Sequence, residues 1–142
     1  MRRQPKGRVS ESKIRVRYAE TDAMGIVHHS RYIPWFEVGR VNLLREVGLP
    51  YGDIEAMGFL FLITELGVRY YRPAHFDEVV TVRTWVDKVY SRGMRLEYEV
   101  VNEAGERLVT AYTKFISVDR EGRPVRLPQR LIEILSEERE PA

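Results

Sequence analysis

The sequence predicts an α+β domain in which one long helix lies on an antiparallel sheet of about five long strands. Apolar residues recur at helical spacing over residues 32–47. Later segments are rich in β-branched and aromatic residues, and short turn sequences separate several of them. One helix packed on one antiparallel sheet is an α+β architecture. The later strand segments are 59–71, 78–90, 94–101 and 107–119.

The first strand is predicted over Lys13–Tyr18, where Ile14 and Val16 alternate with basic residues. A half-buried strand places an apolar side chain on the core face at every second residue. Residues 1–12 are basic, and no apolar stretch follows them as it would in a signal peptide, so they are predicted to form a flexible tail. Residues 13–138 contain no linker or internal repeat, which predicts a single domain.

The long helix is predicted to begin near Ser30 and to end at Gly48. Pro34 fits its first turn, where the missing N–H would have no partner. Glycine is the usual residue just beyond a helix C-terminus. A second, single-turn helix is predicted over residues 51–57. The predicted apolar face of the long helix consists of Tyr32, Trp35, Phe36, Leu43, Leu44 and Val47.

The last two strand segments are connected in a way that favours antiparallel neighbours, because Asn102–Gly105 between them has the composition of a hairpin turn. Glu121–Pro124, after the last strand, has the composition of a second turn. A short helix is predicted after Pro128, with Leu131 and Leu135 on its apolar face. One helix leaves much of a long-stranded sheet uncovered, so we expect association of chains through a sheet edge or face.

The composition limits the possible functions. The 142 residues include 23 basic and 21 acidic ones, a balance that argues against a general nucleic-acid or membrane function. No run approaches the roughly 20 apolar residues of a membrane-spanning helix, so no stable membrane insertion is predicted. Cysteine is absent, which excludes disulfides and agrees with a cytoplasmic location. Nucleic-acid binding through the basic tail is a poorer alternative that predicts strongly salt-dependent binding.

Three ordered motifs resemble those of a known family. Thr21, Asp22, Gly25, Ile26, Val27, His29 and Tyr32 fit the pattern T-D-x-x-G-[IV]-V-x-[HY]-x-x-Y. Tyr71–Ala74 with Asp77 forms the second motif, and Phe115–Asp119 with Gly122–Pro124 forms the third. Together they resemble the hotdog-fold acyl-CoA thioesterases, in the 4-hydroxybenzoyl-CoA thioesterase-like branch that includes Tol–Pal-associated bacterial enzymes. The resemblance covers roughly residues 13–135, with His28 where many relatives carry an aromatic residue.

The resemblance implies a fold, an activity and an assembly. The fold would be the hotdog fold, a sheet wrapped around one central helix, with a short helix at the C-terminus. The activity would be hydrolysis of an acyl-CoA thioester, with Asp22 as nucleophile or as the base that activates water. The backbone amide of His29 would bind the oxyanion, and no cofactor would be needed. Relatives suggest a homotetramer, a dimer of dimers, with active sites at subunit interfaces.

The residue types agree with this chemistry. Thioester hydrolysis needs a group that delivers oxygen and donors that hold an oxyanion. The N-terminus of a helix supplies free N–H groups and a positive dipole end. Gly25 has no Cβ, so backbone and thioester can approach closely there. On spacing alone, Asp22 is equally well a loop or N-cap carboxylate.

Four further residues are candidates for contact with substrate, and three of them also have another interpretation. Tyr32 is most simply a core residue, and Glu37 is more simply a solvated or structural residue. Thr64 lies in an apolar strand, where it would line a pocket or face outward. His28 would shape the acyl pocket. The adjacent His28 and His29 lack a third ligand at recognisable spacing, so no metal site is predicted.

Some features stay open at this point. One alternative is a non-catalytic acyl-CoA-binding module, although such a module would not need an aspartate such as Asp22 beside oxyanion amides. Another is a hotdog hydratase or dehydratase, which would use a histidine-centred pair that is not found here.

Pocket depth depends on side-chain packing, so the acyl group is not predicted. Candidates for binding the phosphates of coenzyme A are Arg92, Lys114, Arg120, Arg123 and Arg126.

Overall fold

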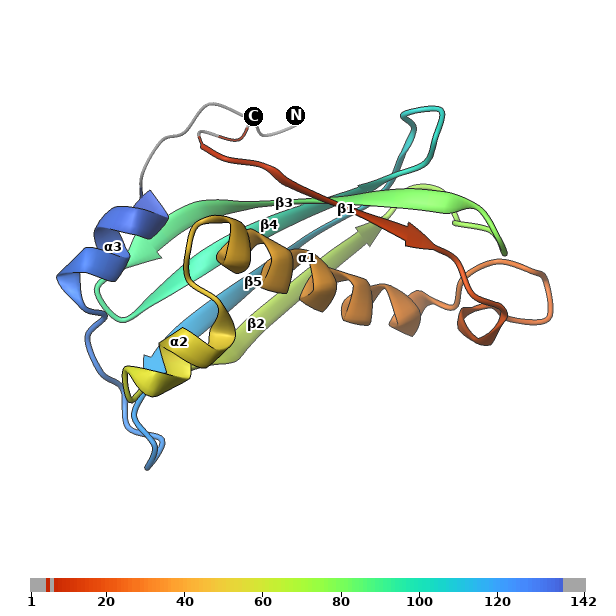
Figure 1. Ribbon diagram of the computed structural model, residues 1–142. Coiled ribbons are helices and arrows are strands. Elements are labelled where there is room, and N and C mark those ends of the chain that lie inside the picture. The colour runs from red at the N-terminus through yellow and green to blue at the C-terminus, as the bar shows by residue number, and fades with distance from the viewer. Residues whose placement is uncertain (1–4, 6, 137–142) are drawn as a thin grey trace.

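The computed structural model describes residue 5 and residues 7–136. Its sheet has five strands in the order β1-β3-β4-β5-β2, and each neighbouring pair is antiparallel (Figure 1). The strands are β1 (Ser10–Arg15), β2 (Leu60–Tyr70), β3 (Val79–Tyr90), β4 (Gly93–Val101) and β5 (Arg107–Val118). The helices are α1 (Tyr32–Glu46), α2 (Tyr51–Ala56) and α3 (Gln129–Ser136), with short 3₁₀ turns η1 (Tyr18–Glu20) and η2 (His29–Arg31).

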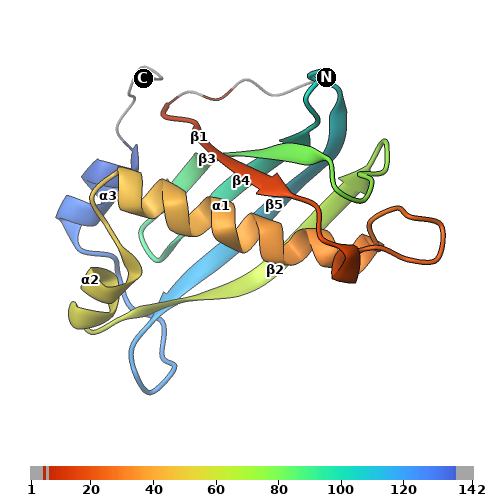
Figure 2. The same ribbon diagram turned by 45° about the vertical axis from the view of Figure 1, so that its right-hand side comes forward.

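Helix α1 lies along one face of the sheet, while α2 and α3 lie near one end of the molecule (Figures 1 and 2). The core forms between α1 and this inner face of the sheet, as the helical and strand periodicities predict. Gly39 allows close approach, because a Cβ there would collide with the Thr84 hydroxyl. Core residues from α1 are Trp35, Phe36, Leu43 and Leu44, and from the sheet Val82, Leu96, Tyr98 and Val100.

The strand order differs from the chain order at one place. The predicted hairpin at Asn102–Gly105 joins β4 to β5, and Gly105 donates its N–H to the Asn102 carbonyl at 2.9 Å. Strand β2, however, pairs with β5 rather than with β3, which follows it along the chain. Residues 71–78 therefore cross from one edge of the sheet toward the other, so that β1 and β2 form the two edges.

The first strand begins earlier than predicted. β1 starts at Ser10, where Lys13 was expected, and it ends at Arg15 instead of Tyr18. Ser10 and Ser12 are buried and pair with β3. Two small hydroxyl side chains give no apolar signal, so alternation located the strand too late. The predicted boundary between residues 12 and 13 thus falls inside β1, while residues 1–4, 6, 137 and 138 lie outside the described residues.

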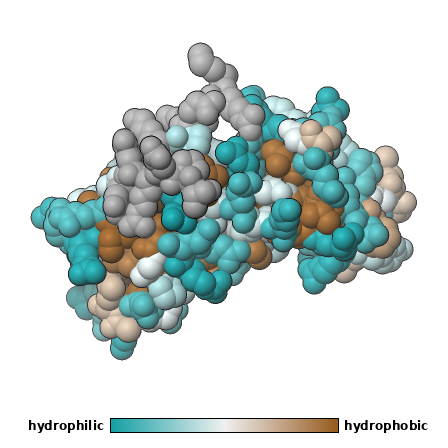
Figure 3. Space-filling view, turned by 45° about the horizontal axis from the view of Figure 1, so that its top comes forward, coloured by the Kyte–Doolittle hydropathy of each residue, from teal (hydrophilic) through white to brown (hydrophobic). Residues whose placement is uncertain are grey.

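One edge of the sheet carries exposed apolar side chains. Leu62, Ile63 and Leu66 of β2 are each between about a third and a half exposed. On α1, Ile33 and Val38 are exposed as well. The view over β1 in Figure 3 shows a largely hydrophilic surface with separate apolar patches toward each end of the molecule. No helix in residues 7–136 combines the length and apolar character required to cross a bilayer.

Candidate active site

The loop between η1 and η2 presents Asp22 to solvent in a defined turn. The Asp22 N–H donates to the Ile26 carbonyl at 2.9 Å, and the Gly25 N–H donates to the Asp22 carbonyl at 3.0 Å. Gly25 has a φ of +78°, a conformation that side chains with a Cβ rarely adopt. Asp22 Oδ1 accepts the Met24 N–H at 2.8 Å. Within the described part of the chain, Oδ2 makes no hydrogen bond or ion pair, so one carboxylate oxygen is available.

The crossing segment 71–78 holds the other side of this loop. The Val27 N–H donates to the Ala74 carbonyl at 2.9 Å, and the Phe76 N–H donates to the Gly25 carbonyl at 3.1 Å. Ile26 forms a β-bridge with His75. Two segments about fifty residues apart along the chain thus form a miniature sheet, which fixes the position of the turn that carries Asp22.

The turn η2 supplies a free backbone donor at the start of α1. His28 caps this turn, with its Nδ1 accepting the Ser30 N–H at 3.2 Å. The Arg31 N–H donates to the His28 carbonyl at 2.9 Å. The His29 N–H has no acceptor among the residues that the structure describes. An unpaired N–H at the positive end of a helix is suited to binding an anion or an oxyanion.

Asp22 and η2 line the same open cavity, which has a volume of about 350 Å³. His28, His29 and Tyr32 line it from one side, and Tyr70 with its neighbours lines it from β2. Burial raises the pKa of the Tyr32 hydroxyl, which accepts the Ala74 N–H at 3.1 Å. The predicted residues Asp22, His28, His29 and Tyr32 are therefore brought together in one place.

The remaining predicted residues lie outside this cavity's lining. Gly25 shapes the turn behind Asp22. Glu37 is exposed on α1. Thr64 lies at the bulge of β2, where its hydroxyl is 3.4 Å from the Lys114 carbonyl. Their contact with substrate stays a prediction, as does that of the five basic residues Arg92, Lys114, Arg120, Arg123 and Arg126, none of which lines the cavity.

Sequence reasoning did not identify Tyr70, Tyr71, Arg72 and Pro73 as lining residues of this cavity. The Tyr70 hydroxyl donates to the His29 carbonyl at 2.7 Å, so the end of β2 contacts η2 directly. Arg72 also lines the cavity, and its guanidinium lies 3.0 Å from Glu106. The one available signal was the motif at residues 71–74, whose place beside Asp22 depends on the crossing of the chain.

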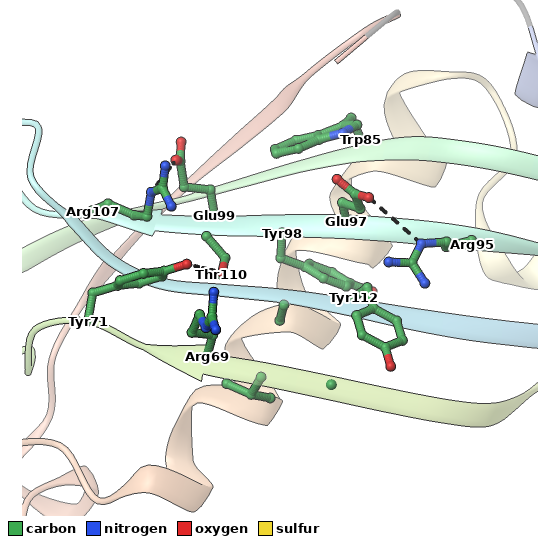
Figure 4. A pocket seen from close by; sticks show the side chains of 13 residues that line it. Arg69, Tyr71, Trp85, Arg95, Glu97, Tyr98, Glu99, Arg107, Thr110 and Tyr112 are labelled. Atoms are coloured by element: carbon green, nitrogen blue, oxygen red, sulfur yellow. Dashed lines mark hydrogen bonds and ion pairs between the residues drawn. The ribbon is translucent and has the colours of Figure 1, made fainter. Parts of the chain in front are cut away.

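A second hollow of about 400 Å³ lies on the outer face of the sheet, opposite α1 (Figure 4). Its charged groups are mostly paired with one another. Glu99 lies 2.7 Å from Arg83 and 3.5 Å from Arg107, and Arg95 lies 3.1 Å from Asp87. Carboxylates held in this way are poor nucleophiles and bases. Asp22, with one oxygen available and a free N–H in the same cavity, is the better centre for chemistry.

The described residues contain no group of three or more histidine, aspartate and glutamate side chains placed to hold a metal ion. His28 and His29 lie together, with ring centroids 4.1 Å apart. The Nδ1 atom of His28 is already in contact with Ser30. Asp22, His28, His29 and Tyr32 give the cavity lining hydrogen-bonding and acid–base groups.

Comparison with known proteins identifies the family. The model of the thioesterase-like superfamily matches residues 16–135. A putative acyl-CoA thioesterase of Bacillus subtilis, YneP, is 40% identical over 113 residues, which cover 80% of this chain and 82% of YneP.

Two solved structures are similar over most of the chain. A hypothetical protein of Thermus thermophilus, TT1821, is 42% identical with a TM-score of 0.84, covering 89% of this chain and 97% of the other. The DHNA-CoA thioesterase of Staphylococcus aureus is 37% identical with a TM-score of 0.80, covering 84% and 81%. The predicted hotdog fold is thereby confirmed, and the chain belongs to the thioesterase-like superfamily.

Proposed function

We propose that this protein hydrolyses the thioester of an acyl-CoA to a free acid and coenzyme A. The observation that carries the proposal is the pairing of two groups in one cavity. Asp22 offers an available carboxylate oxygen, and η2 offers the free N–H of His29. Superfamily membership and the resemblance to YneP, a putative acyl-CoA thioesterase, support the same reaction.

In this reaction the C–S bond of the thioester breaks and an oxygen takes the place of sulfur on the acyl carbon. Asp22 either attacks the acyl carbon itself, giving an anhydride that water then opens, or removes a proton from the attacking water. In both cases negative charge develops on the former carbonyl oxygen. The His29 N–H and the positive end of α1 stabilise that charge. Coenzyme A leaves as the thiolate and takes up a proton, and no cofactor participates.

The other residues at the cavity have supporting roles. Gly25 allows the turn that holds the Asp22 backbone, because its φ is +78°. His28 fixes the start of η2 through Ser30. Tyr32 contributes an aromatic wall, and Arg72, whose guanidinium also pairs with Glu106, is a cation of the lining that suits the phosphates of coenzyme A. A cytoplasmic location, where acyl-CoA is made and consumed, agrees with the absence of cysteine.

The active unit in this proposal is a homo-oligomer, a tetramer built as a dimer of dimers. The exposed apolar side chains of β2 favour association at this edge. Tyr70, at the end of the same strand, lines the cavity, so a chain docked along β2 would lie beside the active site. Glu37 and Thr64, exposed in the single chain, would then lie close to an interface and contact substrate there.

The deciding experiment compares the native protein with Asp22→Asn by free-thiol release from a panel of acyl-CoAs. Asparagine retains the oxygen that accepts the Met24 N–H but is neither a base nor a nucleophile of comparable strength. We expect kcat to fall by roughly a hundredfold or more. Asp53→Asn, an exposed aspartate on α2, is the matched control and should leave turnover unchanged.

Three other results would contradict the proposal. Full turnover by Asp22→Asn would move the chemistry to another group, such as Glu37 or His29. Binding of acyl-CoA without hydrolysis of any member of the panel would identify an acyl-CoA-binding module. Addition or loss of water at the acyl chain, with the thioester intact, would identify a hydratase or dehydratase.

A further inference from the structure

The contact between Tyr70 and His29 joins β2 to the start of α1. The Tyr70 hydroxyl donates to the His29 backbone carbonyl at 2.7 Å, although the two residues are 41 positions apart. This carbonyl and the free His29 N–H belong to the two peptide groups on either side of one α-carbon. A hydrogen bond to the carbonyl therefore restrains the rotation that sets the direction of the N–H.

The peptide group between His28 and His29 is also held in place. The His28 N–H donates to the Glu20 carbonyl at 2.9 Å, and the Arg31 N–H returns to the His28 carbonyl. The His29 N–H thus lies between an anchor on residue 28 and the Tyr70 anchor on residue 29. Oxyanion donors contribute most when their orientation is fixed before the reaction, because no reorganisation is then needed as charge develops.

Tyr70 is itself directed by its neighbours. Its ring packs edge-on against Tyr32, with centroids 5.6 Å apart. Tyr32 is buried, and its hydroxyl accepts the Ala74 N–H at 3.1 Å. The ring of Tyr32 also meets Trp35 of α1 at 4.9 Å. A tyrosine hydroxyl of ordinary pKa is protonated at neutral pH, and burial raises the pKa of Tyr70 further, so its hydroxyl can donate.

We propose that Tyr70 is a positioning residue for thioester hydrolysis, whose hydroxyl holds η2 so that the His29 N–H points at the developing oxyanion. This inference rests on the proposed function. The hydroxyl acts through the His29 backbone and does not need to touch the substrate. Removing it should weaken stabilisation of the transition state more than binding of the ground state.

The test is Tyr70→Phe, which keeps the ring against Tyr32 and removes only the hydroxyl. One hydrogen bond contributes about 1 kcal/mol, which corresponds to a decrease in kcat of roughly fivefold to tenfold. The KM should change by less than about twofold, because the ring that lines the cavity remains. An alkyl-CoA thioether, which has no carbonyl oxygen, should bind native protein and variant equally. Tyr112→Phe, on the outer face of the sheet, is the control and should match the native kcat.

A second measurement follows the contact itself. The amide resonance of His29 in the ¹⁵N spectrum should shift or broaden in Tyr70→Phe and stay in place in Tyr112→Phe. If Tyr70 only stabilised the fold, Tyr70→Phe would lower thermal stability, and its kcat and its affinity for the thioether would keep the same proportion as in the native protein. Native kcat in Tyr70→Phe, or an unmoved His29 resonance, overturns the positioning role.

The experiments distinguish a failure of the proposed function from a failure of the inference about Tyr70. If native protein releases no thiol from any acyl-CoA, or if Asp22→Asn retains full turnover, the reaction or its centre is wrong, and the positioning role is overturned with it. If native protein is active, Asp22→Asn is inactive and Tyr70→Phe is fully active, only the inference about Tyr70 fails.

Discussion

A buried carboxylate, Glu20, connects the loop that carries Asp22 to the core. Its Oε2 accepts the Trp35 indole N–H at 2.6 Å, and its Oε1 accepts the Arg17 N–H at 2.8 Å. Its carbonyl accepts the His28 N–H. One residue thereby ties the beginning and the end of the loop to α1. Buried acceptors shared by two donors are costly to lose, because each donor then has no partner.

Glu20→Gln tests this connection. Glutamine has one side-chain oxygen, so either the Trp35 indole or the Arg17 N–H must face an NH₂ group. We expect the free energy of unfolding to fall by about 1–3 kcal/mol, measured by urea denaturation. Glu103→Gln in the exposed β4–β5 turn provides the comparison and should change stability by less than about 0.5 kcal/mol. Equal stability of the two variants would show that Glu20 contributes nothing specific.

At the level of elements, the distance between α1 and the sheet depends on Gly39. A Cβ at this position would meet the Thr84 hydroxyl and a methyl group of Val82, both of β3. Because the sheet wraps closely around the helix at this point, a small residue is required in the middle of α1. The same approach keeps Trp35 and Tyr32 near the cavity, so helix packing and site geometry are coupled.

Gly39→Ala sets two effects against each other. Alanine raises helix propensity by about 1 kcal/mol, whereas overpacking a tight core costs about 1–3 kcal/mol. We expect net destabilisation, seen as a lower Tm in calorimetry. Gly52→Ala in α2 is the matched control, because a Cβ there meets nothing within 4 Å. A raised Tm in Gly39→Ala would mean that the helix can move away from β3 at little cost.

At the scale of the whole molecule, the sheet is incompletely covered at strand β2. Ile63 and Leu66 pair with Phe115 and Thr113 of β5, whose side chains are buried. Residues directly opposite each other in a sheet share a face, so Ile63 and Leu66 point toward the side of α1. They are nevertheless exposed, and β2 is an edge strand with no neighbour beyond it in the described sheet. Association of chains would bury these side chains together with exposed residues of α1.

We expect the native protein to be a homo-oligomer that Leu66→Glu dissociates. A buried, unpaired carboxylate at the interface would cost several kcal/mol. Light scattering coupled to size-exclusion chromatography should then give the molar mass of one chain for Leu66→Glu. Tyr90→Glu, at the exposed end of β3, should leave the native mass unchanged. A native protein that is already a monomer, or a Leu66→Glu variant that stays assembled, would contradict this expectation.

The sequence by itself determined the type and approximate bounds of the long elements. Periodicity is a local property, so α1 and the strands β2 to β5 were recognisable from apolar spacing. The motif around Asp22 was also local: Asp22, His28, His29 and Tyr32 lie within eleven residues, and in the structure all four line one cavity. Gly25 and Gly105 marked turns because their positive φ values favour glycine.

Only the tertiary structure decided which distant segments meet. The pairing of β2 with β5 brings Tyr70 to His29, and the crossing of residues 71–78 brings Arg72 to the cavity. In the sequence Glu20 resembles a solvated loop residue, and only the structure shows that its carboxylate accepts the Trp35 indole N–H. These contacts depend on strand order and on the packing of α1, which result from the whole core, so no window of neighbouring residues contains them.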